Sequence, residues 1–342
     1  MKIDVSLRDR DLRNVPRLAR TYEDLGYGTL WTSEVGHCPF LPHAVAAVNT
    51  SRIGLGTNIA ISFVRAPLVT AYTAWDLHQA SGGRFQLGLG TQVRAHNERR
   101  YSVPWEHPAP KVRELIECIH AIWNCWQNGA PADFQGRFYR FTLQTPATNP
   151  GPLDHPFPPI WLAGVNPLMC RTAGEVADGI QVHPFHSVRY LEDVVRPAVI
   201  EGARRRDRDP EALQFFASLF VVTGFTEEER RESDATTRER IAYYASTPGY
   251  RSVFDLHGWG DVADTLKLMV RRGEWDRIAG KITDDILETF AIVAPPEQLA
   301  DAILERYQGK LDGVSLYFAP SSDGPQPWWR DFVRRFSAPA SV

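Results

Sequence analysis

Residues 67–90, which read PLVTAYTAWDLHQASGGRFQLGLG, contain one helix followed by one strand and set the pattern for the whole chain. Pro67 suits the first position of a helix, and apolar residues then recur at intervals of three and four on one face. That face consists of Leu68, Ala71, Tyr72 and Trp75. Gly82-Gly83 stops the helix, and the apolar run Phe85–Gly90 predicts a buried strand.

The same alternation extends in both directions from this unit. Strands are expected at residues 2–7, up to Ser33, and at 53–59, 85–90, 159–164, 179–183, 215–223 and 313–318. Helices are expected between them, at 15–25, 40–50, 67–80, 112–127, 167–178 and 188–206. Eight such alternations predict an α/β fold, a (β/α)8 TIM barrel closed by parallel strands.

Three segments depart from the simple alternation. A hairpin is predicted around residues 134–139, followed by a proline-rich connector at 146–159. Residues 226–308 are expected to be entirely helical and to form an excursion at the barrel rim, because one crossover needs far fewer residues. We expect one domain over residues 1–320 and a C-terminal tail over 321–342.

Composition excludes several classes of function. The chain of 342 residues is 43% hydrophobic and 23% charged, which suffices for a large core without metals or disulfides. Its formal net charge is −3 with both signs interspersed, so no nucleic-acid partner is expected. The chain has no apolar stretch long enough to span a membrane, and its four cysteines form no C-x-x-C pair, so we expect a cytoplasmic protein with no membrane partner.

Polar and glycine residues recur directly after the predicted strands. Because active sites of such barrels form at the carboxyl ends of the strands, these segments are the candidates for function. They are Ser33-Glu34-Val35-Gly36-His37, Asn58-Ile59-Ala60-Ile61-Ser62, the run from Gly90 to Arg100, Ala163-Gly164-Val165-Asn166-Pro167 and His183-Pro184-Phe185-His186.

Two longer motifs make the sequence familiar. The run from Ser81 to Gln92 and the run Gly174-Glu175-Val176-Ala177-Asp178-Gly179, with Trp31-Thr32-Ser33-Glu34 upstream, resemble the luciferase-like monooxygenase superfamily. The likeness extends from residue 2 to about residue 320. Shorter segments resemble the branch that uses the deazaflavin coenzyme F420: Thr91-Gln92-Val93, His96-Asn97-Glu98-Arg99-Arg100, His183-Pro184-Phe185-His186 and Leu256-His257-Gly258-Trp259-Gly260.

The resemblance implies a flat tricyclic cofactor lying across the strand ends. It implies a non-proline cis peptide bond between Asn58 and Ile59, a rare feature in proteins. Cofactor contacts are expected at Asn58 and Ile59, at Gly90, Thr91 and Gln92, at Ala163, Gly164 and Val165, and at His183. Free N–H groups of the helix that starts at Pro167 suit a phosphate of the cofactor tail. An ordinary turn or a structural histidine is the alternative at each position.

Three residues are candidates for catalysis. Glu34 occupies a place where relatives carry an acidic residue, but the histidine that follows it in some deazaflavin enzymes is Val35 here, which leaves the general base open. His37 and His96 are the alternatives, since histidine suits proton transfer near neutral pH. His183 and His186 resemble a metal-binding pair, but no further ligand falls at a suitable spacing, so no metal is predicted.

The function that follows from this resemblance is hydride transfer between coenzyme F420 and a small organic substrate. Two alternatives stay open: a monooxygenase that uses reduced flavin mononucleotide (FMN), and a non-catalytic flavin-binding protein. Arg94, Arg99 and Arg100 could pair with an acidic cofactor tail or form a solvated helix face. A homodimer is expected, since symmetric dimers are the commonest soluble assemblies.

Overall fold

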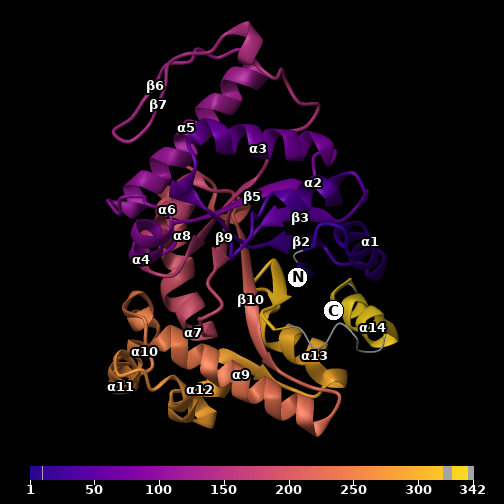
Figure 1. Ribbon diagram of the computed structural model, residues 1–342, viewed down its shortest axis with the longest axis vertical. Coiled ribbons are helices and arrows are strands. Elements are labelled where there is room, and N and C mark those ends of the chain that lie inside the picture. Colours follow the sequence, from indigo (N-terminus) through magenta and orange to yellow (C-terminus); the bar gives the residue numbers. More distant parts are fainter. Residues whose placement is uncertain (10, 319–325, 338–342) are drawn as a thin grey trace.

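Eight parallel strands close into a barrel in the computed structural model, which describes residues 1–9, 11–318 and 326–337 (Figure 1). Their order is β10-β12-β1-β2-β3-β5-β8-β9, and β9 pairs with β10 to close the ring. The barrel strands are β1 (Lys2–Ser6), β2 (Thr29–Thr32), β3 (Gly54–Thr57), β5 (Phe85–Gly90), β8 (Ile160–Gly164), β9 (Gly179–Val182), β10 (Gln214–Val222) and β12 (Gly313–Leu316). The predicted TIM barrel is therefore confirmed.

Helices surround the barrel. The first half of the chain contributes α1 (Val15–Leu25), α2 (Leu41–Ala47), α3 (Pro67–Ala80), α4 (Arg94–Arg100) and α5 (Pro108–Asn128). Next come α6 (Pro167–Val176), α7 (Val188–Tyr190) and α8 (Arg196–Arg204), with a π-helical turn at Leu191–Val195 between the last two. None of the helices described is both long and apolar enough to cross a membrane.

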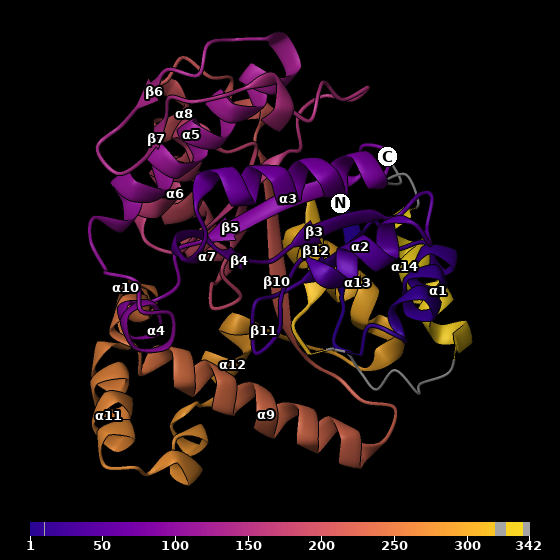
Figure 2. The ribbon, with the colours of Figure 1, turned by 45° about the horizontal axis from the view of Figure 1, so that its top comes forward.

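Most of the segment between β10 and β12 lies on one side of the barrel (Figure 2). It contains α9 (Glu227–Ala245), the 3₁₀ turn η5 (Pro248–Tyr250), α10 (Arg251–Asp255), α11 (Gly260–Arg271), α12 (Asp284–Phe290) and α13 (Pro296–Tyr307). The prediction that this excursion is entirely helical is wrong. Ala291–Val293 forms strand β11, which pairs in parallel with the end of β10. Three apolar residues are too few for periodicity to distinguish a strand from a helix.

Shorter elements complete the chain. The predicted hairpin is present as β6 (Phe134–Gln135) and β7 (Arg140–Phe141), and β4 (Ala60–Ile61) pairs with β5. Part of the expected tail forms a helix, α14 (Gln326–Ser337), which contacts α13, β1 and α1. Trp329, Phe332 and Val333 of that helix are buried. The boundary between domain and tail at residue 320 lies outside the described residues.

Side chains that alternate along the strands form two separate apolar clusters, one outside the barrel and one inside it. Leu30, Leu55, Leu87 and Leu162 belong to the main core between barrel and helices. The barrel interior holds a second, separate cluster of Trp31, Trp161 and Phe216. Trp31 packs against the backbone of Gly56, where a Cβ atom would lie 2.3 Å from the indole. The indole of Trp31 fits inside the barrel because Gly56, on the neighbouring strand, has no side chain.

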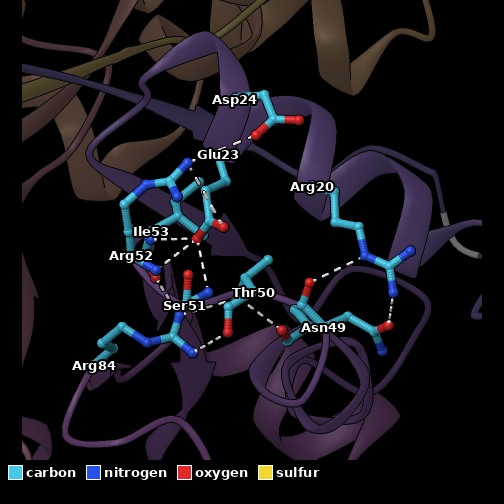
Figure 3. Close-up of polar contacts among 10 residues, drawn as sticks. Arg20, Glu23, Asp24, Asn49, Thr50, Ser51, Arg52, Ile53 and Arg84 are labelled. Carbon is cyan, nitrogen blue, oxygen red and sulfur yellow. Dashed lines mark hydrogen bonds and ion pairs between the residues drawn. The ribbon is translucent and has the colours of Figure 1, made fainter.

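Charged side chains connect α1 and the residues just before β5 to the segment that precedes β3 (Figure 3). One Glu23 carboxylate oxygen accepts the backbone N–H groups of residues 51–53 at 2.6–2.9 Å. Arg84 donates to the carbonyls of Ser81, Ala47, Thr50 and Ile53. Arg84 belongs to the Ser-Gly-Gly-Arg motif, which is part of the resemblance described above. This part of the motif stabilises the end of the barrel opposite the strand carboxyl ends.

Asp4 is the one acidic side chain among the fully buried residues described. Its carboxyl is 5% exposed, Oδ2 accepts the Trp31 indole N–H at 2.9 Å, and Oδ1 has no partner. Burial raises the pKa of Asp4 from 3.8 to about 7, against the opposing effect of the indole hydrogen bond. The folded protein therefore binds a proton here that the unfolded chain has already released near pH 5.

Asp4→Asn should change how stability depends on pH. Because the pKa is raised in the folded state, this group's contribution is complete below about pH 4 and is lost as pH rises to about 7. Asparagine keeps an acceptor for Trp31 and does not ionise. Urea unfolding should therefore show the variant gaining about 3 kcal/mol on wild type between pH 5 and pH 8. Asp133→Asn, at an exposed position, serves as control, and an equal shift in both variants would contradict the assignment.

Candidate functional site

Five consecutive strands, β2, β3, β5, β8 and β9, end in the residues selected from the sequence. Because the strands are parallel, their carboxyl ends meet at one end of the barrel, which we call the mouth. Neighbouring ends are level, since Thr32 pairs with Thr57 and Gly164 with Val182. The half-buried side chains there are Ser33, Glu34, Asn58, Ile59, Thr91, Gln92, Ala163, Val165 and His183.

The end of β3 has the backbone feature that the resemblance implied. The Asn58–Ile59 peptide bond is cis, which confirms that prediction. The Asn58 amide donates to Ser218 Oγ at 3.4 Å across the barrel interior. Ile59 lies against Gly90, where a Cβ atom would come within 2.8 Å of the isoleucine side chain. Gly90 is therefore required for close packing against Ile59, and its contact with a cofactor stays a prediction.

Glu34 is held in an ion pair at the end of β2. Its two carboxylate oxygens accept from the Arg65 guanidinium at 2.5 and 2.9 Å, and Oε2 also accepts the Ile61 N–H at 2.7 Å. The glutamate side chain is 8% exposed and the arginine 21%. Glu34 thus fixes the backbone after Ile59 to the end of β2. A direct catalytic role for Glu34 stays a prediction, and it would require this pair to open.

The loop after β5 is held by a buried asparagine. Asn97 donates to the carbonyls of Thr91 and Val93 at 2.9 and 3.1 Å and is fully buried. Gln92 adopts a positive φ of 58°, and its side chain accepts the Val93 N–H. Thr91 Oγ makes one long contact of 3.4 Å to the Gln92 carbonyl. The threonine hydroxyl is therefore weakly engaged and can reach a bound group.

The two candidate histidines differ in how firmly they are held. His96 lies on α4, half-buried, and the Arg100 guanidinium donates to its Nδ1 at 3.0 Å. In the neutral ring Nε2 then carries the proton. His37 is exposed in the loop between β2 and α2. Arg94, Arg99 and Arg100 are also exposed on α4, and Arg94 lies 3.8 Å from Glu98.

The loop from Ala163 to Asn166 joins β8 to α6 and is bound by the excursion. Asn166 occupies the N-cap position of α6 but makes no capping hydrogen bond. Its amide instead donates to the Gly249 carbonyl at 2.9 Å and accepts from the Ser252 hydroxyl at 2.8 Å. Gly164 packs outward, against Ile180 and Cys170. The expected binding of a cofactor phosphate at this loop stays a prediction.

His183 follows β9 and lies within a group of tyrosines that sequence reasoning did not select. Its ring stacks on Tyr250 at 4.5 Å and meets the edge of Tyr244 at 4.7 Å. Tyr244 and Tyr317 share a hydrogen bond of 2.8 Å between their hydroxyls. Tyr317 directly follows β12, so the rule applied to the other strand ends would have found it. Nothing local marks Tyr244 or Tyr250, which reach the mouth from the excursion.

Comparison with known proteins gives matches along nearly the whole chain. A family model described as luciferase-like monooxygenase matches residues 3–312. An uncharacterised protein of Mycobacterium tuberculosis is 41% identical over 335 residues, which are 98% of this chain and 98% of that protein. A 5,10-methylenetetrahydromethanopterin reductase of Archaeoglobus fulgidus is 23% identical over 311 residues, covering 89% of this chain and 88% of the reductase.

Solved structures share the fold at lower identity. The coenzyme F420-dependent tetrahydromethanopterin reductase from Methanopyrus kandleri superposes with a TM-score of 0.76 at 22% identity, covering 98% of this chain and 97% of the reductase. An EDTA monooxygenase from Chelativorans has a TM-score of 0.71 at 15% identity, covering 98% and 93% of the two chains. The barrel and its excursion are thus common to reductases and monooxygenases.

Breaking the pair between Glu34 and Arg65 should destabilise the mouth. Glu34→Gln keeps an acceptor for the Ile61 N–H but leaves a partly buried guanidinium without its counter-charge, which should cost about 2–3 kcal/mol of unfolding free energy. Arg65→Met should cost a similar amount. In a double-mutant cycle measured by urea unfolding, the double variant should lose at least about 1 kcal/mol less stability than the sum of the two single losses. Additive losses would contradict the proposed pairing.

Proposed function

We propose that this chain, which belongs to the luciferase-like monooxygenase family, transfers a hydride between coenzyme F420 and a small organic substrate. The family makes it an oxidoreductase of the luciferase-like class. The choice of F420 is supported by a reductase relative and by a solved F420-dependent reductase that shares the fold over 98% of this chain. The observation that carries the proposal is the convergence of predicted contact residues from five neighbouring strand ends on one mouth.

The residues present at the mouth fit a flat ring with polar edges. Ile59, Ala163 and Val165 offer half-buried apolar surface, which suits the face of a ring. Along the strand order Thr91 lies between Ile59 and Ala163, and His183 follows Val165, and both side chains can donate hydrogen bonds to ring oxygens or nitrogens. When bound, the deazaflavin supplies a carbon that accepts or gives a hydride.

The protein's own groups would then position the reactants and move the proton. Glu34 and Arg65 keep the backbone after Ile59 in place, and Asn97 holds the loop of Thr91. Tyr244 and Tyr250 of the excursion cover the His183 ring and would limit access of water on that side of a bound cofactor. A substrate carbonyl or alcohol also needs a proton acceptor or donor, and we propose His96 for this role, with His37 as the alternative. Proton transfer at His96 requires the exposed Arg100 side chain to release Nδ1, so that the ring can change its protonation state.

Use of reduced FMN in a monooxygenase is the second candidate function, because an EDTA monooxygenase shares the fold over 98% of the chain. The anion site proposed at the loop before α6 suits either cofactor, since both carry a phosphate. A protein that binds a flavin without turning over substrate is the third candidate. We further propose that the protein acts as a homodimer.

Equilibrium titration separates these candidates. The protein without cofactor should quench the fluorescence of coenzyme F420 with a Kd in the micromolar range or below, and should bind FMN at least about tenfold more weakly. Selective binding of FMN would support the monooxygenase. Binding without any reduction or oxidation across a panel of alcohols, ketones and enones would leave the storage role. Failure to bind either cofactor would overturn all three proposals.

Thr91→Val tests one predicted contact directly. The substitution preserves shape and removes only the hydroxyl, so loss of one hydrogen bond to the ring should raise the Kd of F420 about tenfold, with little change in stability. Ser102→Ala, on the exposed loop after α4, is the control and should leave the Kd unchanged. Equal affinities for wild type and Thr91→Val would remove Thr91 from the site.

His96→Gln and His37→Gln test the proton-transfer group. Loss of a positioned acid or base lowers turnover by about 10²–10⁴-fold without a matching change in affinity. We expect His96→Gln to lower kcat at least about 100-fold and to change the Kd of F420 less than about threefold. The exposed His37→Gln should retain most of the turnover. The reverse pattern would assign the role to His37.

A further inference from the structure

The protonation state of His183 is fixed by the loop that carries it. The backbone N–H of Phe185 donates to His183 Nδ1 at 3.1 Å, so this nitrogen must present a lone pair. His186 Nδ1 meets the carbonyl of His183 at 2.8 Å, which it can only approach as a donor. A neutral His183 ring accepting at Nδ1 carries its proton on Nε2. No hydrogen-bond partner of Nε2 is found among the described residues.

Two tyrosines of the excursion, Tyr250 of η5 and Tyr244 at the end of α9, hold the ring on two sides; we call them the tyrosine clamp. Tyr250 lies nearly parallel to the imidazole, with 26° between the planes, and Tyr244 stands at 89° to it. The Tyr244 hydroxyl is fixed by Tyr317 of the barrel at 2.8 Å. The imidazole is therefore limited to one orientation by groups from both excursion and barrel.

The surroundings disfavour an imidazolium. Desolvation by burial, with a smaller contribution from His186, lowers the pKa of His183 to about 3. Burial likewise lowers the pKa of His186 to about 4 and raises the pKa of Tyr250 to about 12. The pKa of Tyr244 is also raised, chiefly by desolvation and then by Tyr317. His186, Tyr244 and Tyr250 are thus neutral near pH 7, with the cation of Arg240 beyond Tyr244.

We propose that His183 is a permanently neutral hydrogen-bond donor, held by the tyrosine clamp so that Nε2–H faces the ligand at the mouth, and that it positions the ligand without exchanging a proton with it. This inference deepens the proposed function, since the ligand is the redox cofactor or its substrate. It separates the two kinds of histidine at the mouth. His183 orients, and the proton of the reaction must pass through another group, for which His96 is proposed.

The tyrosine clamp also indicates a role for the excursion, which is to hold two loops of the mouth in place. Tyr250 belongs to the segment that bonds to Asn166 through Gly249 and Ser252, so the same short stretch touches the loops after β8 and β9. Displacement of that stretch would release the His183 ring to solvent and would open the loop before α6. The proposed cofactor contacts at His183 and at the loop before α6 are therefore coupled through residues 249–252.

Nuclear magnetic resonance of ¹⁵N-histidine-labelled protein tests the charge state without any cofactor. The pair of His183 nitrogen signals, identified by its absence in His183→Gln, should show the neutral Nε2–H form and stay constant from pH 5 to pH 9. Tyr250→Leu should expose the ring, and its signals should then titrate within this range. Tyr250→Phe keeps the stacked ring and should behave as wild type. Titration in the wild type, or a proton on Nδ1, would overturn the proposal.

Affinity measurements test the donor. His183→Leu should raise the Kd of whichever cofactor the wild type binds by about tenfold or more, whereas His183→Gln, which keeps an N–H donor, should stay within about threefold. Neither variant should alter the pH dependence of kcat. Tyr243→Phe, next to the clamp on α9, is the matched control for tyrosine loss and should match wild type.

The two proposals fail in different ways. If the wild type binds neither F420 nor FMN, the proposed function is wrong, while the histidine signals still decide whether the ring is neutral and clamped. If a cofactor binds and His183→Leu binds it as tightly as wild type, the function stands and His183 is not a donor to it. A change in the pH profile of kcat in His183→Gln would make His183 a proton-transfer group and would overturn the inference.

Discussion

The parallel alignment of eight strands in a closed ring is the constraint on which the rest of this structure depends. Closure leaves no free edge in the ring and sends every carboxyl end to one mouth. Residues separated by more than a hundred positions, such as Asn58 and Ser218, thereby come within hydrogen-bonding distance. The site is a consequence of topology first and of the individual side chains second.

The two ends of the barrel carry different tasks, and the motifs divide between them. Arg84, just before β5, and Glu23 of α1 both bind the backbone of Ile53 just before β3, at the amino ends of these strands. Arg84 nonetheless belongs to one of the runs by which the family is recognised. Gly90, at the other end of the same run, makes room for Ile59 at the mouth. The run from Ser81 to Gln92 thus contains one residue that stabilises the barrel at its amino end, Arg84, and one that shapes the mouth, Gly90.

Much of the fold could be predicted because it depends on local pattern. The strand at Phe85–Gly90 and the helix starting at Pro67 lie where periodicity, proline and glycine indicated them. Strand β11 was missed because three apolar residues carry no usable period, and its pairing with β10 is a long-range contact. The residues after the strands could be selected by rule. The partners of those residues could not, since Arg65 and Tyr250 reach their positions through tertiary packing alone.

The composition of the mouth also limits which chemistry its residues can perform. Glu34 is paired with Arg65, and His183 is bonded at Nδ1 and enclosed by aromatic rings, so both are suited to holding a geometry. A group that exchanges protons must change its charge, which enclosure by aromatic rings disfavours. His96 is half-buried on α4, and its Nδ1 accepts from the exposed side chain of Arg100, which can move away into solvent. A charge that must appear and disappear during turnover costs least where water can still reach it, which is the physical reason for proposing proton transfer at His96 and a positioning role for His183.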